Sequence, residues 1–231
     1  MSLPLFLVDS LDTEALDGPE GHHAADVMRL RVGERLLLGD GRGGVASAVV
    51  RAVGRGRLDL SIVERWYRDP PAPRLVVAQG IAKGDRGELA VQAMTEVGVD
   101  EIVPWAAARS VARWKDDRPL ERWRATAREA AKQARRPWLP EVSAPVSTTG
   151  LVPRVTFVLH EEADARLSTV ELPTDPELVL VVGPEGGVAP EELTAFTAAG
   201  AVSVRLGDAV LRTSTAGVAA LSVLSARLGR W

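Results

Sequence analysis

The sequence contains no cysteine among its 231 residues. This absence excludes disulfide bonds, thiolate metal sites and a cysteine nucleophile. We also expect no targeting leader, because the opening MSLPLFLVDSLD has no basic residue and its apolar stretch is interrupted by Pro4 and Asp9. No later segment approaches the roughly 20 apolar residues of a membrane span. These absences predict a soluble cytoplasmic protein with no membrane partner.

Two common nucleotide-binding patterns are missing as well. The chain has no G-x-G-x-x-G followed by an acidic residue and no G-x-x-x-x-G-K-[ST]. It therefore supports neither a dinucleotide site of the Rossmann type nor a phosphate-binding loop. We expect no metal site either.

One segment is strongly basic although the formal net charge is −3. Residues 109–136 carry ten basic and four acidic side chains, a net charge of +6. Such a density neutralises several phosphates if it lies on one face, but a solvated helix surface has the same composition. The arginines predicted to contact RNA are four from this segment and two from the N-terminal part: Arg109, Arg113, Arg135, Arg136, Arg29 and Arg31.

The N-terminal part is typical of a small all-β domain. Four apolar stretches are separated by glycine and aspartate turns: PLFLV, ERLLLGD, GVASAVVRAV and RLDLSIVERW. Their partial alternation predicts strands with one face on a core and the other in water, which a compact barrel would provide. The stiff segment Asp69-Pro70-Pro71-Ala72-Pro73 suits a linker. We therefore predict a domain of residues 1–70 and a second of residues 71–231.

The second part alternates strands and helices, which indicates a parallel α/β domain. Strands are expected at 74–80, 101–106, 155–160, 177–183 and 202–207. Helices are expected at 87–98, 119–136, 190–200 and 214–228. The longest of these, 119–136, has apolar residues at three- and four-residue steps and is amphipathic and basic.

Two loops in this domain favour a binding site. Gly183-Pro184-Glu185-Gly186-Gly187 follows the apolar strand LVLVV, and Arg205–Ala216 leads from another strand into a helix of small residues. Glycines let the backbone approach a ligand closely at the carboxyl edge of a parallel sheet, although a tight connection without a ligand has the same composition. Arg212, just before the helix, fits an anionic or carbonyl-bearing ligand as well as a surface salt bridge.

These loops resemble a known family. GPEGG followed by PEE, and then LGDAVLRTSTA, is similar to the paired signature loops of RsmE-type methyltransferases of the SPOUT superfamily. Further segments match the family in order: His22–Leu30, Lys83-Gly84-Asp85, Thr95–Val99, Arg109-Ser110 and Glu129–Gln133. The resemblance covers nearly the whole chain.

The resemblance implies a fold, a reaction and a pocket. The fold is a PUA-like β-barrel followed by a SPOUT α/β domain with a deep trefoil knot, and the protein is a homodimer. The reaction is methylation of N3 of one uridine in 16S rRNA of the small ribosomal subunit, with S-adenosyl-L-methionine as cofactor. The implied cofactor-binding residues are Leu159, His160, Gly183, Pro184, Glu185, Gly186, Gly187, Leu206, Gly207, Leu211 and Ser214.

The chemistry adds two candidate catalytic residues. N3 of uridine carries a proton that must leave, so the site needs a base or a group that stabilises the uridine anion. Arg212 is the candidate stabiliser. Glu185 is a candidate contact to the donor or the base, with ordering of its loop as the alternative.

One departure from the family pattern leaves a second function open. The family usually has an acidic residue in the stretch R-T-E-T-A, where this chain has Ser214. The alternative is an RNA-binding or ribosome-assembly protein that keeps the fold with altered catalysis. A third possibility, a small-molecule α/β enzyme that binds another nucleotide, leaves the barrel and the basic helix unexplained.

Overall fold

A computed structural model describes residues 3–231, so Met1 and Ser2 lie outside the described residues. The chain divides into two compact units, which are described separately. The first unit runs to Pro70 and also contains Ala131–Leu139. The second contains Pro71–Ala130 and Pro140–Trp231.

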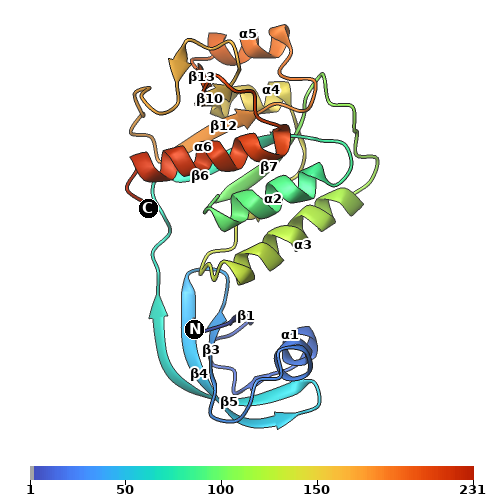
Figure 1. The fold of residues 1–231 in the computed structure, drawn as a ribbon, viewed down its shortest axis with the longest axis vertical. Helices are drawn as coiled ribbons and strands as arrows, with labels where there is room; N and C mark the ends of the chain where they lie inside the picture. Colours follow the sequence, from blue (N-terminus) through green and yellow to red (C-terminus); the bar gives the residue numbers. More distant parts are fainter. Residues whose placement is uncertain (1–2) are drawn as a thin grey trace. The chain divides into compact units, whose positions relative to one another are not determined.

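The first unit is built on one five-stranded sheet that curls around its core (Figure 1). Its strands are β1 (Leu5–Leu7), β2 (Ala15–Leu16), β3 (Arg35–Gly39), β4 (Gly44–Gly54) and β5 (Arg57–Tyr67), in the order β1-β3-β4-β5-β2. The long pair β4 and β5 has two register shifts, after Ser47 and after Val50. Such irregularities increase local twist and bend a strand pair, which lets a small sheet curl.

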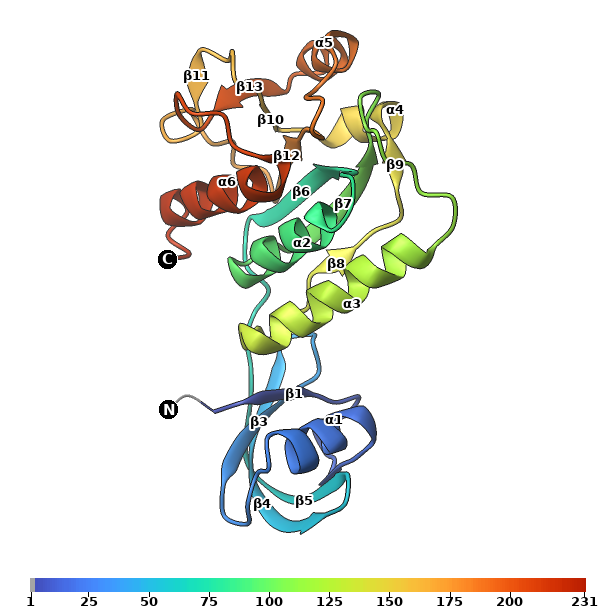
Figure 2. The same cartoon turned by 45° about the vertical axis from the view of Figure 1, so that its right-hand side comes forward.

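The short β2 leads into a helical turn that covers one end of this sheet. Helix α1 (Gly18–His22) continues into a π-helical turn, His23–Val27 (Figure 2). Gly21 makes the close approach possible, because a Cβ there would lie 2.5 Å from the carbonyl oxygens of Leu16 and Gly56. Phe6, Leu16 and other large apolar residues of the sheet form the core under this turn.

The four predicted strands of the first unit are confirmed, whereas the predicted alternation holds only in part. In β5, buried Leu58 and Leu60 flank exposed Asp59, as expected for a half-buried strand. In β4, however, Ser47 is buried like its neighbours Ala46 and Ala48. This half of β4 is therefore covered on both faces, which apolar patterning did not indicate.

The segment Ala131–Leu139 completes the first unit. Its backbone pairs with the β3–β4 turn: Leu139 N–H donates to the Gly41 carbonyl over 3.0 Å, and Gly43 N–H donates to the Pro137 carbonyl over 2.9 Å. The Trp138 indole donates to the Arg68 carbonyl over 2.8 Å. A segment about 60 residues along the chain from Pro70 thus contributes backbone pairs to the N-terminal unit.

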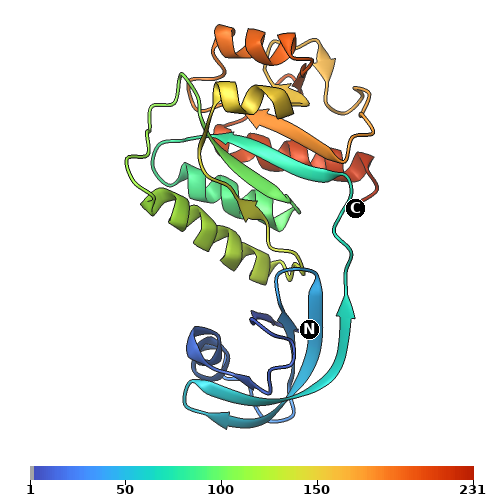
Figure 3. The same ribbon diagram turned by 180° about the vertical axis from the view of Figure 1, so that it is seen from behind.

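The second unit is a parallel sheet of eight strands with helices on both faces (Figure 3). Its strands are β6 (Arg74–Gly80), β7 (Glu101–Ala106), β8 (Glu141–Val142), β9 (Val146–Ser147), β10 (Phe157–Leu159), β11 (Ala165–Arg166), β12 (Glu177–Val182) and β13 (Val202–Arg205). Its helices are α2 (Arg86–Glu96), α3 (Arg118–Gln133), whose last turn belongs to the first unit, α4 (Thr148–Leu151) with a 3-10 turn at Val152–Arg154, α5 (Pro190–Ala198) and α6 (Thr213–Arg227). The strand order is β11-β13-β10-β12-β6-β7-β8, with β9 beside β7.

Alternate residues of the central strands supply two separate cores. Leu178 and Leu180 of β12 face the core formed with α2, α3 and α6. Val179 and Val181 of the same strand face the core that contains Phe196 of α5. A strand covered on both faces is apolar throughout, which explains the uninterrupted run LVLVV.

The predicted parallel α/β class and all nine predicted strands and helices of this unit are confirmed to within about three residues at each end. The prediction for 119–136 was wrong at its end, because α3 stops at Gln133. Arg135 has a φ of 54°, a left-handed conformation that ends a helix. The short β2, β8, β9 and β11 were not predicted, since two residues carry no readable period. No helix among residues 3–231 is long and apolar enough to cross a membrane.

A charged network ties together the amino ends of the parallel strands. Glu101 of β7, with only 5% of its side chain exposed, contacts Arg154 and Arg74, each over 3.0 Å. Burial alone would raise the pKa of Glu101, but hydrogen bonds from Arg154 and Ser143 and the charges of both arginines outweigh it and lower the pKa. Hydrogen bonds to Glu101 and Glu177 and the charges of these two carboxylates raise the pKa of Arg154, against the lowering effect of burial.

We predict that Glu101→Gln lowers the free energy of unfolding by about 2–3 kcal/mol at pH 7. Because the folded-state pKa of Glu101 is lowered, its contribution is complete above the ordinary glutamate pKa of about 4.3 and is lost as the pH falls through the folded value. Urea unfolding at pH 7 and at lower pH should show the difference between variant and wild type shrinking. Glu141→Gln, whose side chain is 61% exposed, is the control and should cost under about 1 kcal/mol.

Candidate functional site: a cavity at the carboxyl ends of the strands

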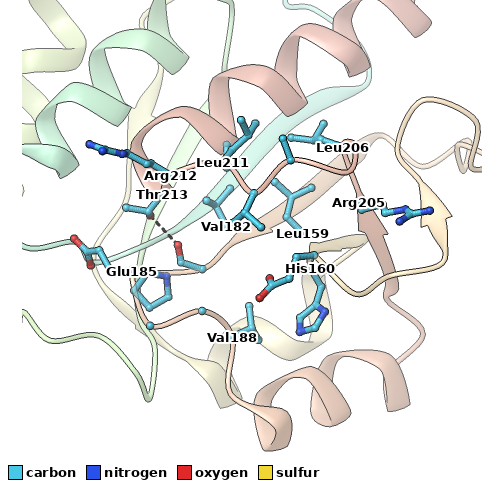
Figure 4. A pocket seen from close by; sticks show the side chains of 18 of the residues that line it. Leu159, His160, Val182, Glu185, Val188, Arg205, Leu206, Leu211, Arg212 and Thr213 are labelled. Carbon is cyan, nitrogen blue, oxygen red and sulfur yellow. Dashed lines mark hydrogen bonds between the residues drawn. The ribbon is translucent and has the colours of Figure 1, made fainter.

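A cavity of about 520 Å³ opens where β10, β12 and β13 end (Figure 4). Three loops surround it, and they follow Leu159, Val182 and Arg205 in turn. Because all strands are parallel, these loops meet at one edge of the sheet, where open α/β folds bind ligands. The charged side chains in the lining are four arginines and two glutamates: Arg86, Arg109, Arg205, Arg212, Glu161 and Glu185.

The loop after β12 is made tight by its glycines. Gly187 has a φ of 73° and donates from its N–H to the Pro184 carbonyl over 2.9 Å, which closes the turn. A Cβ on Gly183 would lie 3.2 Å from the backbone of Gly187 and Val188. A Cβ on Gly80 of β6 would lie 2.5 Å from the Pro184 nitrogen. Side chains larger than hydrogen are therefore excluded where the loop folds back on the sheet.

A buried relay joins this loop to the start of α6. The Thr213 hydroxyl donates to the Gly183 carbonyl over 2.7 Å, the dashed contact in Figure 4. The same hydroxyl accepts a hydrogen bond of 2.9 Å from the amide of Gln79, which is completely buried in β6. Gln79, Thr213 and Gly183 thus fix the distance between two of the three cavity loops.

Glu185 holds the glycine loop to the segment before α2. Its Oε1 accepts from the Lys83 backbone N–H over 3.0 Å and lies 3.6 Å from the guanidinium of Arg86. Both contacts are within the protein, and Glu185 also lines the cavity. The Oε1 contacts tie the glycine loop to the segment around the start of α2.

Glu192, in the first turn of α5, fixes the turn that carries Arg109. It is buried, and its Oε1 accepts from the Ala108 N–H over 2.8 Å and from the Thr148 hydroxyl over 2.7 Å. The second oxygen accepts from the Ala189 N–H over 3.1 Å. The Arg109 guanidinium donates to the Gly186 carbonyl over 3.3 Å. One carboxylate therefore secures a turn that contacts the glycine loop.

The loop after β13 is the open side of the cavity. Val210 is 76% exposed and Leu211 41% exposed. Asp208 lies 3.3 Å from Arg166 and 3.6 Å from Arg205, contacts that hold the base of the loop. Exposed apolar residues at the mouth of a cavity are available for a ligand.

The cavity brings together most of the predicted site residues. Those that line it are Leu159, His160, Gly183, Pro184, Glu185, Gly186, Gly187, Leu206, Gly207, Leu211, Arg212 and Arg109. Ser214 does not line it; this side chain is buried in the first turn of α6, and Arg212 occupies the N-cap position without a side-chain cap bond. Arg113 is exposed and not part of the lining, and Arg29, Arg31, Arg135 and Arg136 belong to the first unit.

Sequence reasoning missed the residues that hold the loops in place. Gln79 carried a signal, because it is a polar residue in the otherwise apolar strand RLVVAQG. Thr213 and Glu192 lie within motifs that were recognised, but nothing in the spacing indicated their partners. Among residues 3–231, no group of three or more histidine, aspartate or glutamate side chains is placed to hold a metal ion.

Comparison with known proteins explains this arrangement. Residues 69–225 match the model of an RNA methyltransferase domain, and residues 16–63 match that of an RNA methyltransferase PUA domain. Ribosomal RNA small subunit methyltransferase E of Mycobacterium bovis is 48% identical, with 98% of this chain and 93% of that protein covered. The chain belongs to the ribosomal RNA small subunit methyltransferase E family. The resemblance seen in its motifs is thereby confirmed.

Solved structures of this family agree with the fold. The family member from Neisseria gonorrhoeae, bound to S-adenosyl methionine, is 25% identical with a TM-score of 0.87, and 98% of both chains are covered. A methyltransferase from Legionella pneumophila, solved with the cofactor SAM, is 27% identical with a TM-score of 0.86 at the same coverage. Both units of the present chain are therefore those of the family.

We predict that Thr213→Val disrupts the cavity edge without a change in side-chain shape. It removes the donor to Gly183 and deprives the buried Gln79 amide of its shortest bond, which should cost about 1–3 kcal/mol in urea unfolding. Hydrogen exchange should show faster opening of the Gly183–Gly187 loop. Thr215→Val removes an exposed hydroxyl bonded only to the Arg212 carbonyl and should change neither measurement appreciably. Equal effects of the two substitutions would contradict the relay.

Proposed function

We propose that this protein transfers the methyl group of S-adenosyl-L-methionine to N3 of a uridine in 16S rRNA of the small ribosomal subunit. The observation that carries the proposal is the three-loop cavity in a chain that matches the rRNA methyltransferase family over nearly its full length. The names of the relatives support the cofactor and the small-subunit rRNA. The N3 position rests on the resemblance of the two signature loops.

The residues of the cavity fit this cofactor. Leu159, Leu206 and Leu211 offer apolar surface suited to a purine ring. The backbone of the Gly183–Gly187 loop is reachable because no Cβ covers Gly183, Gly186 or Gly187. The cofactor supplies a methyl group activated by a positively charged sulfur. His160 lines the same cavity, and its Nδ1 accepts from the Glu162 N–H over 3.3 Å, which orients the ring.

Arg212 is our candidate for the residue that acts on the uridine. It is exposed, it lines the cavity and it precedes Thr213, whose hydroxyl anchors it beside the glycine loop. When the N3 proton leaves, negative charge spreads over the ring oxygens, and a guanidinium donates hydrogen bonds to such oxygens. Because the relay holds Thr213, the neighbouring backbone of Arg212 is held beside the glycine loop.

The position of Ser214 in the structure supports the second candidate function less than the identity of the residue did in the sequence. A non-catalytic RNA-binding or assembly protein was motivated by the absence of an acidic residue at this position. Ser214 is 5% exposed and lies outside the cavity lining. The enzyme therefore remains our proposal, and the assembly role becomes the outcome indicated by cofactor binding without transfer.

The family resemblance supports further proposals about the assembly. We infer a trefoil knot in the C-terminal part of the second unit, a homodimer, and action in the cytoplasm, where small subunits are made. We also propose RNA contacts by the predicted arginines. Arg29, Arg31, Arg109, Arg113 and Arg135 are exposed, and exposed guanidinium groups neutralise phosphates, whereas Arg136 is half-buried. Sedimentation equilibrium of the full chain tests the dimer.

The direct test is transfer of labelled methyl to small-subunit particles from a strain without this activity. Mass spectrometry of the digested rRNA should then show 3-methyluridine. Label at another atom or in another nucleoside would overturn the N3 assignment while leaving a methyltransferase. Cofactor binding with no label in any rRNA would favour the assembly protein.

We predict that Arg212→Ala lowers kcat about 10²–10³-fold, the usual effect of removing a donor to a developing oxyanion. Calorimetry should show cofactor affinity within about twofold of wild type, and Arg212→Lys should restore part of the rate. Arg118→Ala removes an arginine that is 88% exposed and outside the lining, and it should leave kcat unchanged. A rise in the cofactor Kd with unchanged kcat would assign Arg212 to the cofactor instead.

We predict that Gly183→Val weakens cofactor binding at least about tenfold. The new side chain would press on the backbone of Gly187 and Val188, so the loop that forms one wall must move. Gly150→Ala is the control, because its Cβ would meet only the Ser147 hydroxyl at 3.8 Å. Calorimetric titration of both variants with S-adenosylmethionine makes the comparison.

A further inference from the structure

The first unit contains a second cavity, of about 470 Å³, that the proposed reaction does not use. Pockets that accept small organic ligands have volumes of about 300–1,000 Å³. Its walls come from β1 and the two residues before it, the helical turn after α1, the start of β3 and the end of α3. The lining residues are Leu3, Pro4, Leu5, Phe6, His23, Met28, Leu30, Glu34, Arg35, Lys132, Gln133 and Arg135.

The inner wall is apolar and aromatic. Phe6 is 1% exposed, and its ring meets the His23 ring edge-on, with centroids 6.0 Å apart and planes at 83°. Met28 is 44% exposed at the mouth, and the neighbouring Val27 is 61% exposed. A planar apolar ligand would cover surface that water now contacts.

The charges are arranged around this wall. Glu34 is the one acidic residue among the lining residues, and one of its oxygens accepts from the Arg31 N–H over 2.8 Å. The other oxygen is left for a ligand. Arg35 and Arg135 are exposed, and neither has an acidic partner within the described residues. Lys132 differs, because it is buried and lies 2.8 Å from Glu20.

Strained backbone marks the same place. Arg29 has a φ of 56° and Arg135 a φ of 54°, and within residues 3–231 they are the two non-glycine residues with positive φ. Arg135 lines the cavity, and Arg29 lies between the lining residues Met28 and Leu30. The left-handed region is unfavourable for side chains with a Cβ, so glycine would be the cheaper residue at both positions. Both residues lie just after a helical segment, and a left-handed residue there ends the helix.

We propose that this cavity receives one unstacked base of single-stranded RNA. The base lies against His23, which the buried Phe6 supports, and against Met28, and the free oxygen of Glu34 accepts from an N–H on the edge of the base. The adjoining phosphates lie against Arg35 and Arg135. Stacking surface combined with cations is how proteins hold unpaired nucleotides. The inference rests on the proposed function for its RNA partner, but it adds a site remote in sequence from the methyl-transfer loops.

The experiment measures binding of the full chain to two labelled probes, decauridylate and a ribose-phosphate decamer without bases. Wild type is expected to bind decauridylate about tenfold more tightly, because stacking requires a base. Met28→Ser removes the exposed wall and should bring the ratio of the two affinities close to one. Val53→Ser, at a 46% exposed apolar position of β4 outside the cavity, is the matched control and should keep the wild-type ratio.

Arg135→Gly tests the phosphate contact and relieves the left-handed backbone at the same time. It should weaken decauridylate binding about threefold to tenfold and reduce the slope of log affinity against log salt by about one. Arg55→Gly removes an exposed charge from the β4–β5 turn of the same unit and should change affinity less than twofold. Circular dichroism and S-adenosylmethionine titration verify that each variant is folded.

Methyl transfer to small subunits, measured on the same preparations, separates this inference from the proposed function. Transfer by wild type without any preference for decauridylate over the base-free decamer overturns the cavity assignment and leaves the function intact. Equal losses in Met28→Ser and Val53→Ser overturn it as well. A base preference abolished by Met28→Ser supports the cavity even if no methyl group is transferred.

Discussion

The hydroxyl of Thr213 is the contact on which the shape of the site depends. It donates to the Gly183 carbonyl at the end of β12 and accepts from Gln79 in the neighbouring strand β6. Without it, the start of α6 would lose its side-chain hydrogen bonds to the glycine loop and to β6. Arg212 precedes this threonine and Leu211 precedes Arg212, so the anchored hydroxyl also places the end of the loop after β13. A neutral hydrogen-bond pair in a dry interior is well suited to this task, because its strength does not vary with salt.

The two ends of the parallel sheet are stabilised by different means. At the amino ends, Glu101 and the arginines around it join several strands through charge. At the carboxyl ends, glycines leave space for the cavity, and its loops are held by the Thr213 hydroxyl and by carboxylates that accept from backbone N–H groups. A sheet anchored firmly at one end can keep an opening at the other, since the strain of the loops is not transmitted to the cores. Stability and binding are thus assigned to opposite edges.

The sequence predicted the elements whose patterns repeat. The run LVLVV, buried on both faces, and the helix 119–136, with its apolar stripe, had clear periods. The loop Gly183–Gly187 could also be predicted as a candidate binding site, because it directly follows a strand of a parallel sheet and loops at that edge bind ligands. The basic charge of residues 109–136 was also evident from the sequence. The end of α3 was predicted at the wrong residue, because nothing in the sequence indicated that Arg135 adopts a left-handed backbone.

The features that the sequence did not predict depend on contacts between residues that are distant in the chain. Glu192 meets Ala108 and Thr148, and no spacing rule relates these positions. Ser47 resembled a solvent-facing strand residue and is buried. The second cavity could not be predicted either, because it combines β1 with the last turn of α3.

The return of Ala131–Leu139 to the first unit means that the chain passes between the units three times, after residues 70, 130 and 139. A ribosome makes the chain from its N-terminus, so the five strands of the first unit emerge before Ala131–Leu139. The first unit can therefore be completed only after Leu139 has been made. By then β6, α2 and β7 of the second unit have already been made.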